Sequence, residues 1–340
     1  MERNESKPVG RRDFLRAGSI LAGGSLVSSL LPKATLAHTG FSRSAANSAN
    51  VPPQQGSSAD RLAQMRAEGA AVPLATQKLR DNVYWLYGPG GNMVVFNGPD
   101  GKILVDSSYL AVAPKLKAAL DSIGNAPLKI LINTHWHFDH TDGNSPMHQA
   151  GATIYAHENT RTRLSTAQDV AAFGLHFDPA PADAWPVQTF TDAMQLYVAG
   201  EEIKMGYIQP AHTDGDIYVK FTKNNVVHMG DVFFAQRYPF IDKSSGGSID
   251  GMIAGATKGL TLVDADTKII PGHGDMTNKA GLEKYRDMLV TVRDRVQTQK
   301  RAGKSLEETI ATKPTAEFDA TWGNGLVKPD LFVMVVYSTL

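Results

Sequence analysis

Residues 134–140, with the sequence THWHFDH, concentrate three imidazoles and one carboxylate in a single short stretch. They follow residues 129–133 (KILIN), a short apolar run rich in β-branched side chains that predicts a buried strand. Alternate residues of extended backbone share a face, so His135 and His137 can point at one metal ion. Asp139 and His140 come after the turn and would reach a second ion nearby. The stretch therefore predicts a metal site in the loop that leaves this strand.

The composition limits the kinds of site and partner that the chain can have. Its 340 residues suit one large domain or two small ones, and a hydrophobic fraction of 42% can build a sizeable core. The chain contains no cysteine, which excludes disulfide scaffolds, thiolate metal sites and cysteine nucleophiles. Its 34 basic residues balance its 34 acidic ones, so nucleic acid is not expected as the main partner.

Residues 1–37 have the pattern of a twin-arginine signal peptide. Arg11 and Arg12 begin the run RRDFL, and an uncharged stretch extends from residue 17 to residue 31. That stretch is too short for a stable membrane span but fits the apolar region of a signal peptide. Because twin-arginine export carries folded proteins, we expect the translocation machinery as a partner and a periplasmic or secreted mature protein. Residues 38–77 are then expected to form a linker and an N-terminal extension, with a short helix near 58–70.

Residues 78–300 alternate between short apolar runs and segments of helical spacing. Two β-rich halves, each closed by helices, predict an α/β fold of the four-layer αβ/βα sandwich type. Residues 168–188 interrupt the alternation, and we interpret them as a loop that is either a rim or lid over the metal site or a surface insertion without a role. Residues 301–340 are expected to form a C-terminal helical extension. Strands are predicted at 82–87, 93–96, 103–106, 153–156, 202–209, 217–222, 225–230 and 267–270, and the main helices at 112–123, 157–164, 248–262 and 277–300.

Three further candidate ligands stand where a predicted strand gives way to a loop. His212 follows the run IQPA, Asp231 follows VVHMG, and His273 lies within IIPGHGD. Small residues beside each allow the backbone to turn sharply, which leaves the side chain at the edge of a sheet. Together with the first cluster they place five histidines and two aspartates at successive strand ends.

In these motifs the chain resembles the metallo-β-lactamase superfamily, whose recurring metal motifs match in order over about residues 78 to 300. The resemblance implies that His135, His137 and His212 bind one ion. It implies that Asp139, His140 and His273 bind the other, and that Asp231 bridges both. The metals would then lie at the shared edge of the two sheets.

The chemistry implied is that of a dinuclear metal hydrolase. Neutral imidazole and carboxylate are good Zn²⁺ ligands, and a set without soft ligands leaves iron or manganese open. Two ions that share a carboxylate also share a water, whose pKa falls towards ~7, so a bridging hydroxide is the expected nucleophile. Asp139 is the candidate catalytic residue that orients this water or passes its proton to the leaving group. Asp214, Asp216 and Asp275 are expected to fix the imidazole tautomers.

The sequence says less about the substrate than about the type of reaction. Zinc β-lactamases of similar fold have Cys or Ser where this chain has Asp231, and one class has a Lys three residues later, where this chain has Phe234. We therefore expect hydrolysis of a small ester, lactone, thioester or amide. A β-lactamase-like activity and a mononuclear iron-dependent sulfur dioxygenase chemistry are the alternatives among enzymes, and metal binding without catalysis is the alternative outside them.

Overall fold

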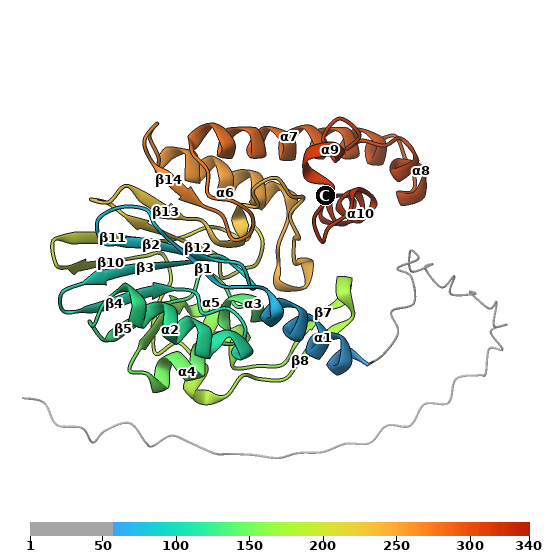
Figure 1. Cartoon of the computed structure of the whole chain (residues 1–340). Coiled ribbons are helices and arrows are strands. Elements are labelled where there is room, and N and C mark those ends of the chain that lie inside the picture. Colours follow the sequence, from blue (N-terminus) through green and yellow to red (C-terminus); the bar gives the residue numbers. More distant parts are fainter. Residues whose placement is uncertain (1–56) are drawn as a thin grey trace, which may run out of the picture. The chain divides into compact units, whose positions relative to one another are not determined.

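Two β-sheets packed face to face form the centre of the computed structural model, which describes residues 57–340. The predicted signal peptide and the first part of the predicted linker lie outside the described residues. Helices cover the outer face of each sheet, so the order of layers is αβ/βα (Figure 1). This arrangement confirms the predicted fold class.

The larger sheet has seven strands and begins as an antiparallel meander. Its second half is parallel, because helices connect the later strands and return the chain to the same end of the sheet. In order across the sheet the strands are β1 (Ala75–Lys78), β2 (Val83–Tyr87), β3 (Met93–Gly98), β4 (Gly101–Val105), β5 (Leu128–Ile132), β6 (Thr153–His157) and β9 (Gln188–Phe190).

The smaller sheet has five strands, antiparallel except for the last pair. The parallel pair β13–β14 places the residues that follow both strands at the same end of the sheet. In order the strands are β10 (Ala193–Val198), β11 (Glu201–Tyr207), β12 (Ile217–Phe221), β13 (Val226–His228) and β14 (Lys268–Ile270).

Side-chain alternation along the strands builds two kinds of core. On β3, Val94 and Phe96 face the smaller sheet, and Phe96 stacks with Phe221 of β12 at a centroid distance of 6.2 Å. Met93 and Val95 of the same strand point the other way, into the layer of helices. Both faces are therefore apolar, which explains why this strand is a continuous hydrophobic run rather than an alternating one.

The outer helices have the spacing that their sequence predicts. In α2 (Ala113–Ile123), Leu116 and Leu120 are buried against the larger sheet, and the helix ends at Gly124. Long α7 (Lys279–Arg301) is capped by Asn278 and buries a stripe that packs with α6 (Ile249–Thr261) on the smaller sheet. Shorter α-helices are α3 (Phe138–Thr141), α4 (Asn144–Gln149) and α5 (Glu158–Leu164), and 3₁₀ turns occupy Leu110–Val112, Ala171–Phe173, Ala182–Ala184, Gly230–Val232 and Lys243–Ser245.

The interpretation of residues 168–188 as a loop was wrong in its secondary structure. About half of the segment forms a hairpin, β7 (Gln168–Val170) with β8 (Leu175–Phe177), and its last residue begins the sheet strand β9 (Gln188–Phe190). The hairpin packs beside α1 (Ser58–Ala71), where the amide of His176 donates to Ser58 Oγ at 2.6 Å. Strand β10 was not predicted, because its side chains alternate only between exposed and half-buried positions at the edge of the sheet.

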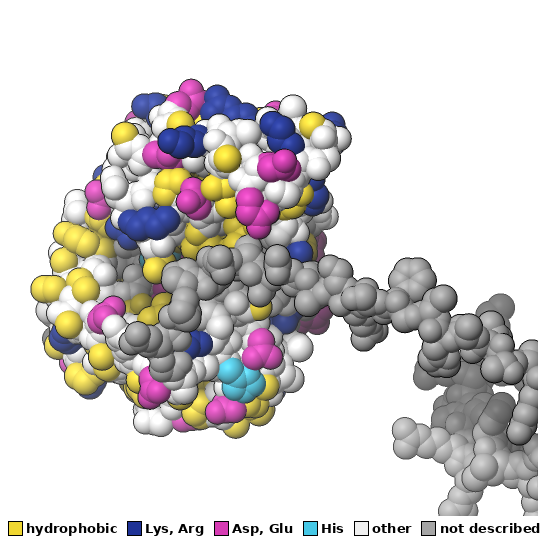
Figure 2. Space-filling view, turned by 90° about the vertical axis from the view of Figure 1, so that its right-hand side faces the viewer, with side chains coloured by type: hydrophobic (Ala, Val, Ile, Leu, Met, Phe, Trp, Pro, Cys, Tyr) yellow, Lys and Arg dark blue, Asp and Glu magenta, His cyan; other side chains and the backbone are white. Residues whose placement is uncertain are grey.

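The C-terminal segment is helical and packs on the same core as α6 and α7. It consists of α8 (Leu306–Ala311), α9 (Asp319–Trp322) and α10 (Pro329–Thr339). Phe332 of α10 stacks with Tyr238 at a centroid distance of 4.6 Å, and both rings are fully buried. Among residues 57–340, no helix combines the length and apolarity needed to cross a membrane. On the face shown in Figure 2, basic and acidic side chains are intermixed.

Truncating Phe332 tests whether α10 belongs to the cooperative core. We expect Phe332→Ala to lower the free energy of unfolding by about 3–5 kcal/mol, because it leaves a cavity beside Tyr238. Urea denaturation followed by circular dichroism measures the change. Tyr197→Ala is the control: Tyr197 is 74% exposed on β10, and its loss should change stability by less than about 0.5 kcal/mol. A main transition unmoved by Phe332→Ala would show that α10 unfolds separately.

Candidate metal centre

All seven predicted ligand residues meet at one edge of the two sheets. The turn after β5 carries His135 and His137, and α3, which starts directly afterwards, carries Asp139 and His140. The other three follow strands of the smaller sheet: His212 lies between β11 and β12, Asp231 follows β13, and His273 follows β14. Strands that end at a common edge thus bring together residues that are far apart in the sequence.

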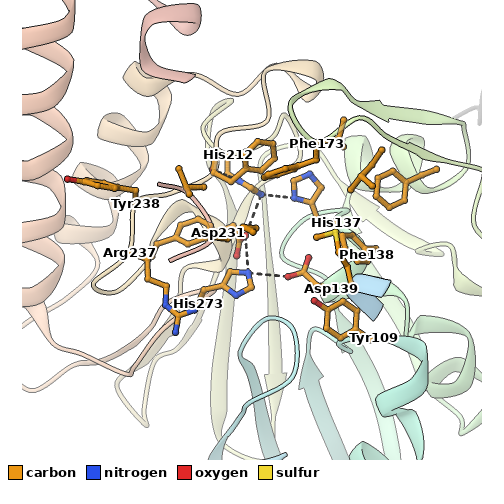
Figure 3. Close-up of a pocket in the computed structure, with 18 residues that line it drawn as sticks. Tyr109, His137, Phe138, Asp139, Phe173, His212, Asp231, Arg237, Tyr238 and His273 are labelled. Atoms are coloured by element: carbon orange, nitrogen blue, oxygen red, sulfur yellow. Dashed lines mark hydrogen bonds and ion pairs between the residues drawn. The ribbon is translucent and has the colours of Figure 1, made fainter. Parts of the chain in front are cut away.

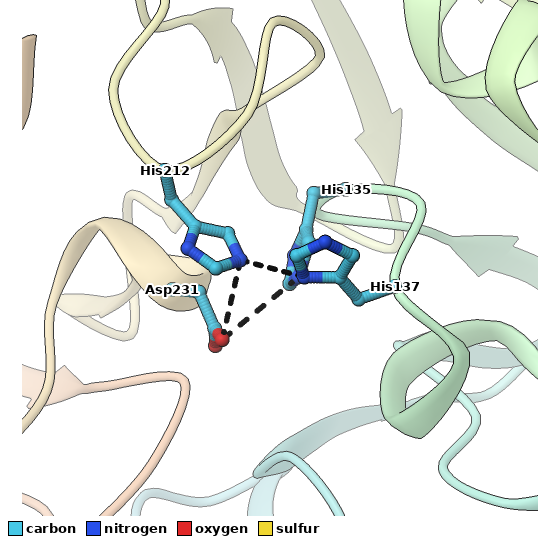
Figure 4. A group of neighbouring side chains, drawn as sticks. All are labelled: His135, His137, His212 and Asp231. Carbon is cyan, nitrogen blue, oxygen red and sulfur yellow. Dashed lines mark hydrogen bonds and ion pairs between the residues drawn. The ribbon is translucent and has the colours of Figure 1, made fainter. Parts of the chain in front are cut away.

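The first group of donors consists of His135, His137, His212 and Asp231, whose ligand atoms lie within 4.8 Å of one another (Figure 4). His137 Nδ1 and His212 Nε2 are 2.8 Å apart. The Asp231 carboxylate closes the group, with its Oδ2 3.5 Å from His212 Nε2 and 3.9 Å from His135 Nε2.

The second group consists of Asp139, His140 and His273. Asp139 Oδ2 lies 3.1 Å from His273 Nε2, and the two imidazole Nε2 atoms are 3.4 Å apart. Asp231 reaches this group as well: Oδ1 is 3.1 Å from His140 Nε2, and Oδ2 is 3.3 Å from His273 Nε2. The Asp231 carboxylate therefore lies between both groups, which is the position that a bridging ligand requires.

Hydrogen bonds on the outer side of the rings fix which nitrogen faces the centre. His140 Nδ1 is 2.8 Å from Asp106 Oδ2, and His212 Nδ1 is 2.8 Å from the carbonyl oxygen of Phe240. His137 Nε2 is 3.1 Å from Asp242 Oδ2. Since carboxylate and carbonyl oxygens only accept, each of these outer nitrogens carries the proton. The inner nitrogen of a neutral ring then presents a lone pair to the centre.

Two buried atoms are left without a hydrogen bond at this centre. Within residues 57–340, His135 Nε2 and Asp231 Oδ1 are fully buried and form no hydrogen bond, and the nearby Nε2 of a neutral His140 offers Oδ1 a lone pair rather than a proton. Unpaired buried polar atoms are rare, because leaving one unsatisfied costs about 1–3 kcal/mol. Their orientation towards the converging imidazoles fits a cation ligand. The donor set thus suits a divalent metal such as Zn²⁺.

The electrostatic environment separates neutral from charged groups. Burial lowers the pKa of His212 to about 4 and holds the pKa of His135 well below its ordinary value. Burial also opposes the charge of Asp231, but His273, His140 and His135 hold the pKa of this carboxyl well below its ordinary range. For His273, burial is outweighed by the carboxylates of Asp231 and Asp139, which raise its pKa to about 9. The carboxylates are thus ionised and available at neutral pH.

The residues that orient the imidazoles differ from those expected. Asp214 pairs with Arg163 at 2.8 Å, Asp216 accepts from the backbone amides of His212 and Thr213, and Asp275 is exposed. The expectation that these three fix the imidazole tautomers was wrong. Asp106 and Asp242 take that role.

Asp106 and Asp242 were missed because each belongs to a distant segment. Asp106 ends the run ILVD of β4, next to β5 in the sheet, and its Oδ1 accepts from the Thr134 amide at 2.8 Å. An aspartate at the end of the strand next to the one that precedes His135 could have indicated a partner for the histidines. Asp242 is 105 residues from His137, and no local pattern marks it.

Two glycines permit the close packing of this centre. A Cβ at Gly91 would overlap the ring of His140, and a Cβ at Gly272 would overlap Oδ1 of Asp231. Both positions therefore require a residue without a side chain. Gly272 precedes His273 directly, so the turn that exposes the imidazole also makes room for the shared carboxylate.

A cavity opens above the donors (Figure 3). The hairpin supplies Val170, Phe173, Leu175 and Phe177 to its wall, so the expected rim over the site is present as a pair of strands. Residues after Asp231 supply the opposite wall, and Phe240 contacts Phe173 at a centroid distance of 4.6 Å. Phe234 stacks on His273, with ring centroids 5.3 Å apart.

Comparisons with known proteins agree on the family and the fold of this chain. The sequence profile of the metallo-β-lactamase superfamily matches residues 86–285, more than half of the chain. An uncharacterised protein from Mycobacterium leprae (strain TN) is 25% identical over 198 residues, which cover 55% of this chain and 87% of that protein.

Solved structures share the fold at low sequence identity. The DIM-1 metallo-β-lactamase has a TM-score of 0.51 and 20% identity, and the match covers 65% of this chain and 99% of that one. A metallo-β-lactamase from Pontibacter korlensis has a TM-score of 0.51 and 16% identity, with 64% of this chain and 99% of that chain covered. A double mutant of the sec-alkyl sulfatase PisA1 has a TM-score of 0.60 and 15% identity, with 81% of this chain and 51% of that chain covered.

Replacing Asp106 tests its support of the metal donors. We expect Asp106→Asn to weaken Zn²⁺ binding by about 10- to 100-fold, because an amide cannot accept from both Thr134 and His140 as the carboxylate does. Competition with a chelating dye measures the affinity. The control Asp264→Asn changes a carboxylate that binds Asn225 and Thr267 away from the centre and should leave the affinity unchanged. Equal affinities of the two variants would contradict the supporting role of Asp106.

Proposed function

Because the chain belongs to the metallo-β-lactamase superfamily, we propose that it is a metal-dependent hydrolase of a small ester, lactone, thioester or amide. The observation that carries this proposal is the position of Asp231, whose carboxylate faces both groups of donors. A shared carboxylate is typical of a two-metal hydrolytic centre. The cavity above the donors gives a substrate access to it.

The donors divide between two ions as their grouping suggests. His135, His137 and His212 would hold one ion, and Asp139, His140 and His273 the other, with Asp231 shared. Zinc is the first candidate for neutral imidazoles and carboxylates, and iron or manganese also suits such ligands. When bound, the ions supply Lewis acidity that makes water nucleophilic at neutral pH and polarises the substrate's carbonyl.

The chain's own groups supply positioning and proton transfer. The carboxylate of Asp139 lines the cavity and lies 3.1 Å from His273 Nε2, so it stands between the donors and a bound substrate. There it can accept a proton from the attacking water and return it to the leaving group. The aromatic walls exclude water, which strengthens the electrostatic interactions inside the cavity.

β-Lactam hydrolysis is an alternative that the wall of the cavity supports less well. The position three residues after Asp231 is Phe234, whose ring stacks on His273 and lines the cavity. It offers an apolar surface at the position where one class of zinc β-lactamases has a lysine, so a carboxylate would have to be held by a residue elsewhere in the cavity. Mononuclear iron-dependent sulfur dioxygenase chemistry would leave one of the two donor groups unused.

Removing the shared carboxylate tests the proposed function. We expect Asp231→Ala to lower kcat/KM by about 1,000-fold and to reduce the bound metal from about two ions per chain, because both donor groups lose a ligand. Elemental analysis and a panel of 4-nitrophenyl esters, lactones, thioesters and nitrocefin measure both effects. Asp100→Ala, at an exposed turn, is the control. Unchanged turnover in Asp231→Ala would refute the shared role, and one iron per chain with thiol-dependent oxygen consumption would refute the hydrolase.

We also propose that the protein is exported by the twin-arginine route to the periplasm or the medium. The proposal rests on the RRDFL run and the uncharged stretch within residues 1–37, which lie outside the described residues. We expect Arg11→Lys/Arg12→Lys to leave the precursor in the cytoplasm, with at least a tenfold loss of mature protein in the periplasmic fraction. Immunoblots of fractionated cells measure this distribution. Undiminished export of the double variant would contradict the twin-arginine route.

A further inference from the structure

The cavity above the metal donors is apolar apart from one basic side chain. Its walls carry aromatic and aliphatic residues from the hairpin, from the segment after Asp231 and from the C-terminal region. Within residues 57–340, Arg237 is the one charged side chain lining this cavity besides the candidate ligands. A ligand that fills the cavity must therefore be largely apolar, and a charge on it finds a partner only at the metal ions or at Arg237.

Arg237 stands where the cavity meets a polar groove. The same side chain lines both spaces, and Leu326 is the other residue that they share. The groove is otherwise lined mainly by polar groups and backbone, including Gln236, Asp275 and Asn324. Figure 3 shows Arg237 on the same side of the cavity as His273 and opposite Phe138 and Tyr109. The site thus has an apolar half and a polar half, with a cation at their junction.

The guanidinium of Arg237 is available for a ligand. Arg237 is exposed, and in the part of the chain that the structure describes it forms no ion pair and no side-chain hydrogen bond. An arginine left unpaired at the mouth of an apolar cavity is poised to bind an oxyanion, because its parallel N–H groups match pairs of carboxylate, sulfate or phosphate oxygens.

The backbone that carries Arg237 is held on both sides. The amide of Ala235 donates to the carbonyl of His273 at 2.9 Å, and the amide of Tyr238 donates to the carbonyl of Trp322 at 2.9 Å. The buried hydroxyl of Tyr238 donates to Asp319 at 2.8 Å. The side chain of Arg237 is therefore presented from a fixed base, which lowers the entropy lost when it binds an anion.

We propose that the substrate is an amphiphilic anion, with an apolar group under the hairpin and a carboxylate or similar anionic group bound by Arg237. The proposal rests on the proposed hydrolase function for the position of the cleaved bond, which lies over the metal donors between these two parts. Hydrolysis adds water across the acyl C–O bond and releases an acid and an alcohol. Arg237 binds substrate and transition state alike, so its loss raises KM and leaves kcat nearly unchanged.

Matched esters test the anionic group by activity. The zinc-loaded protein is assayed with the mono-4-nitrophenyl esters of succinate, glutarate, adipate and suberate, and with neutral 4-nitrophenyl esters of the same chain lengths. We expect at least one anionic ester to have a KM about 10-fold below its neutral partner. Arg237→Met should raise that KM about 10-fold and leave the KM of the neutral ester unchanged. Arg237→Lys should have a KM for the anionic ester between those of the unaltered protein and Arg237→Met.

Binding of a ligand that cannot be hydrolysed separates this inference from the hydrolase itself. Calorimetry compares the binding of 4-phenylbutyrate with that of 4-phenyl-1-butanol. We expect Arg237→Met to lower the affinity for the carboxylate about 10-fold and to leave the affinity for the alcohol unchanged. Lys284→Met is the control, because Lys284 is exposed on α7 and lines neither space. If no ester is cleaved but this binding difference persists, the hydrolase fails and the anion site stands. If Arg237→Met changes the affinity for both ligands equally, or for neither, the anion site is refuted.

Discussion

A buried carboxylate surrounded by imidazoles is the constraint on which the rest of this structure depends. Asp231 is 4% exposed, and a charge buried this deeply costs several kcal/mol unless it is compensated. The surrounding rings compensate it only if they are protonated or if their inward-facing lone pairs hold a cation beside the carboxylate. Asp106, Asp242 and the Phe240 carbonyl impose that orientation from outside. A folded state with this centre but without those outer partners would leave several buried polar atoms unsatisfied.

The two-sheet architecture supplies the rigid frame that such a centre requires. Every donor stands within five residues of the end of a strand or in the first turn of a short helix, close to the regular backbone hydrogen bonding of the sheets. The cavity walls have a different origin. They come mainly from a hairpin, a segment of irregular backbone and the C-terminal region, which are attached to the frame but are not part of either sheet. The metal donors and most of the cavity wall thus come from different parts of the chain.

The sequence predicted what local patterns encode and missed what depends on packing. The buried strand before His135 and the small residues around Asp231 and His273 are local signals, and the structure brings these residues together. Strand β10 gives no comparable signal, since no position on it is fully buried. The role of Asp242 is set by a contact across 105 residues, and an aspartate beside serines in a loop is an ordinary sequence feature. Arg237 was visible as a charge near Asp231, but its place at the junction of two spaces depends on segments far away in the sequence.

The cavity wall reaches beyond the part of the chain that matches the superfamily. Met65 of α1 and Leu326 and Val327 of the C-terminal region line it, yet the match covers residues 86–285. The Trp322 carbonyl, which accepts a hydrogen bond from the backbone amide of Tyr238 next to Arg237, also lies outside that range. The seven candidate ligands, in contrast, all lie within the matched range, so the terminal segments shape the cavity without supplying a metal donor. Paralogues that keep the same metal ligands but differ at both ends of the chain would then be expected to process different compounds, and transferring the terminal segments between them would transfer the preference.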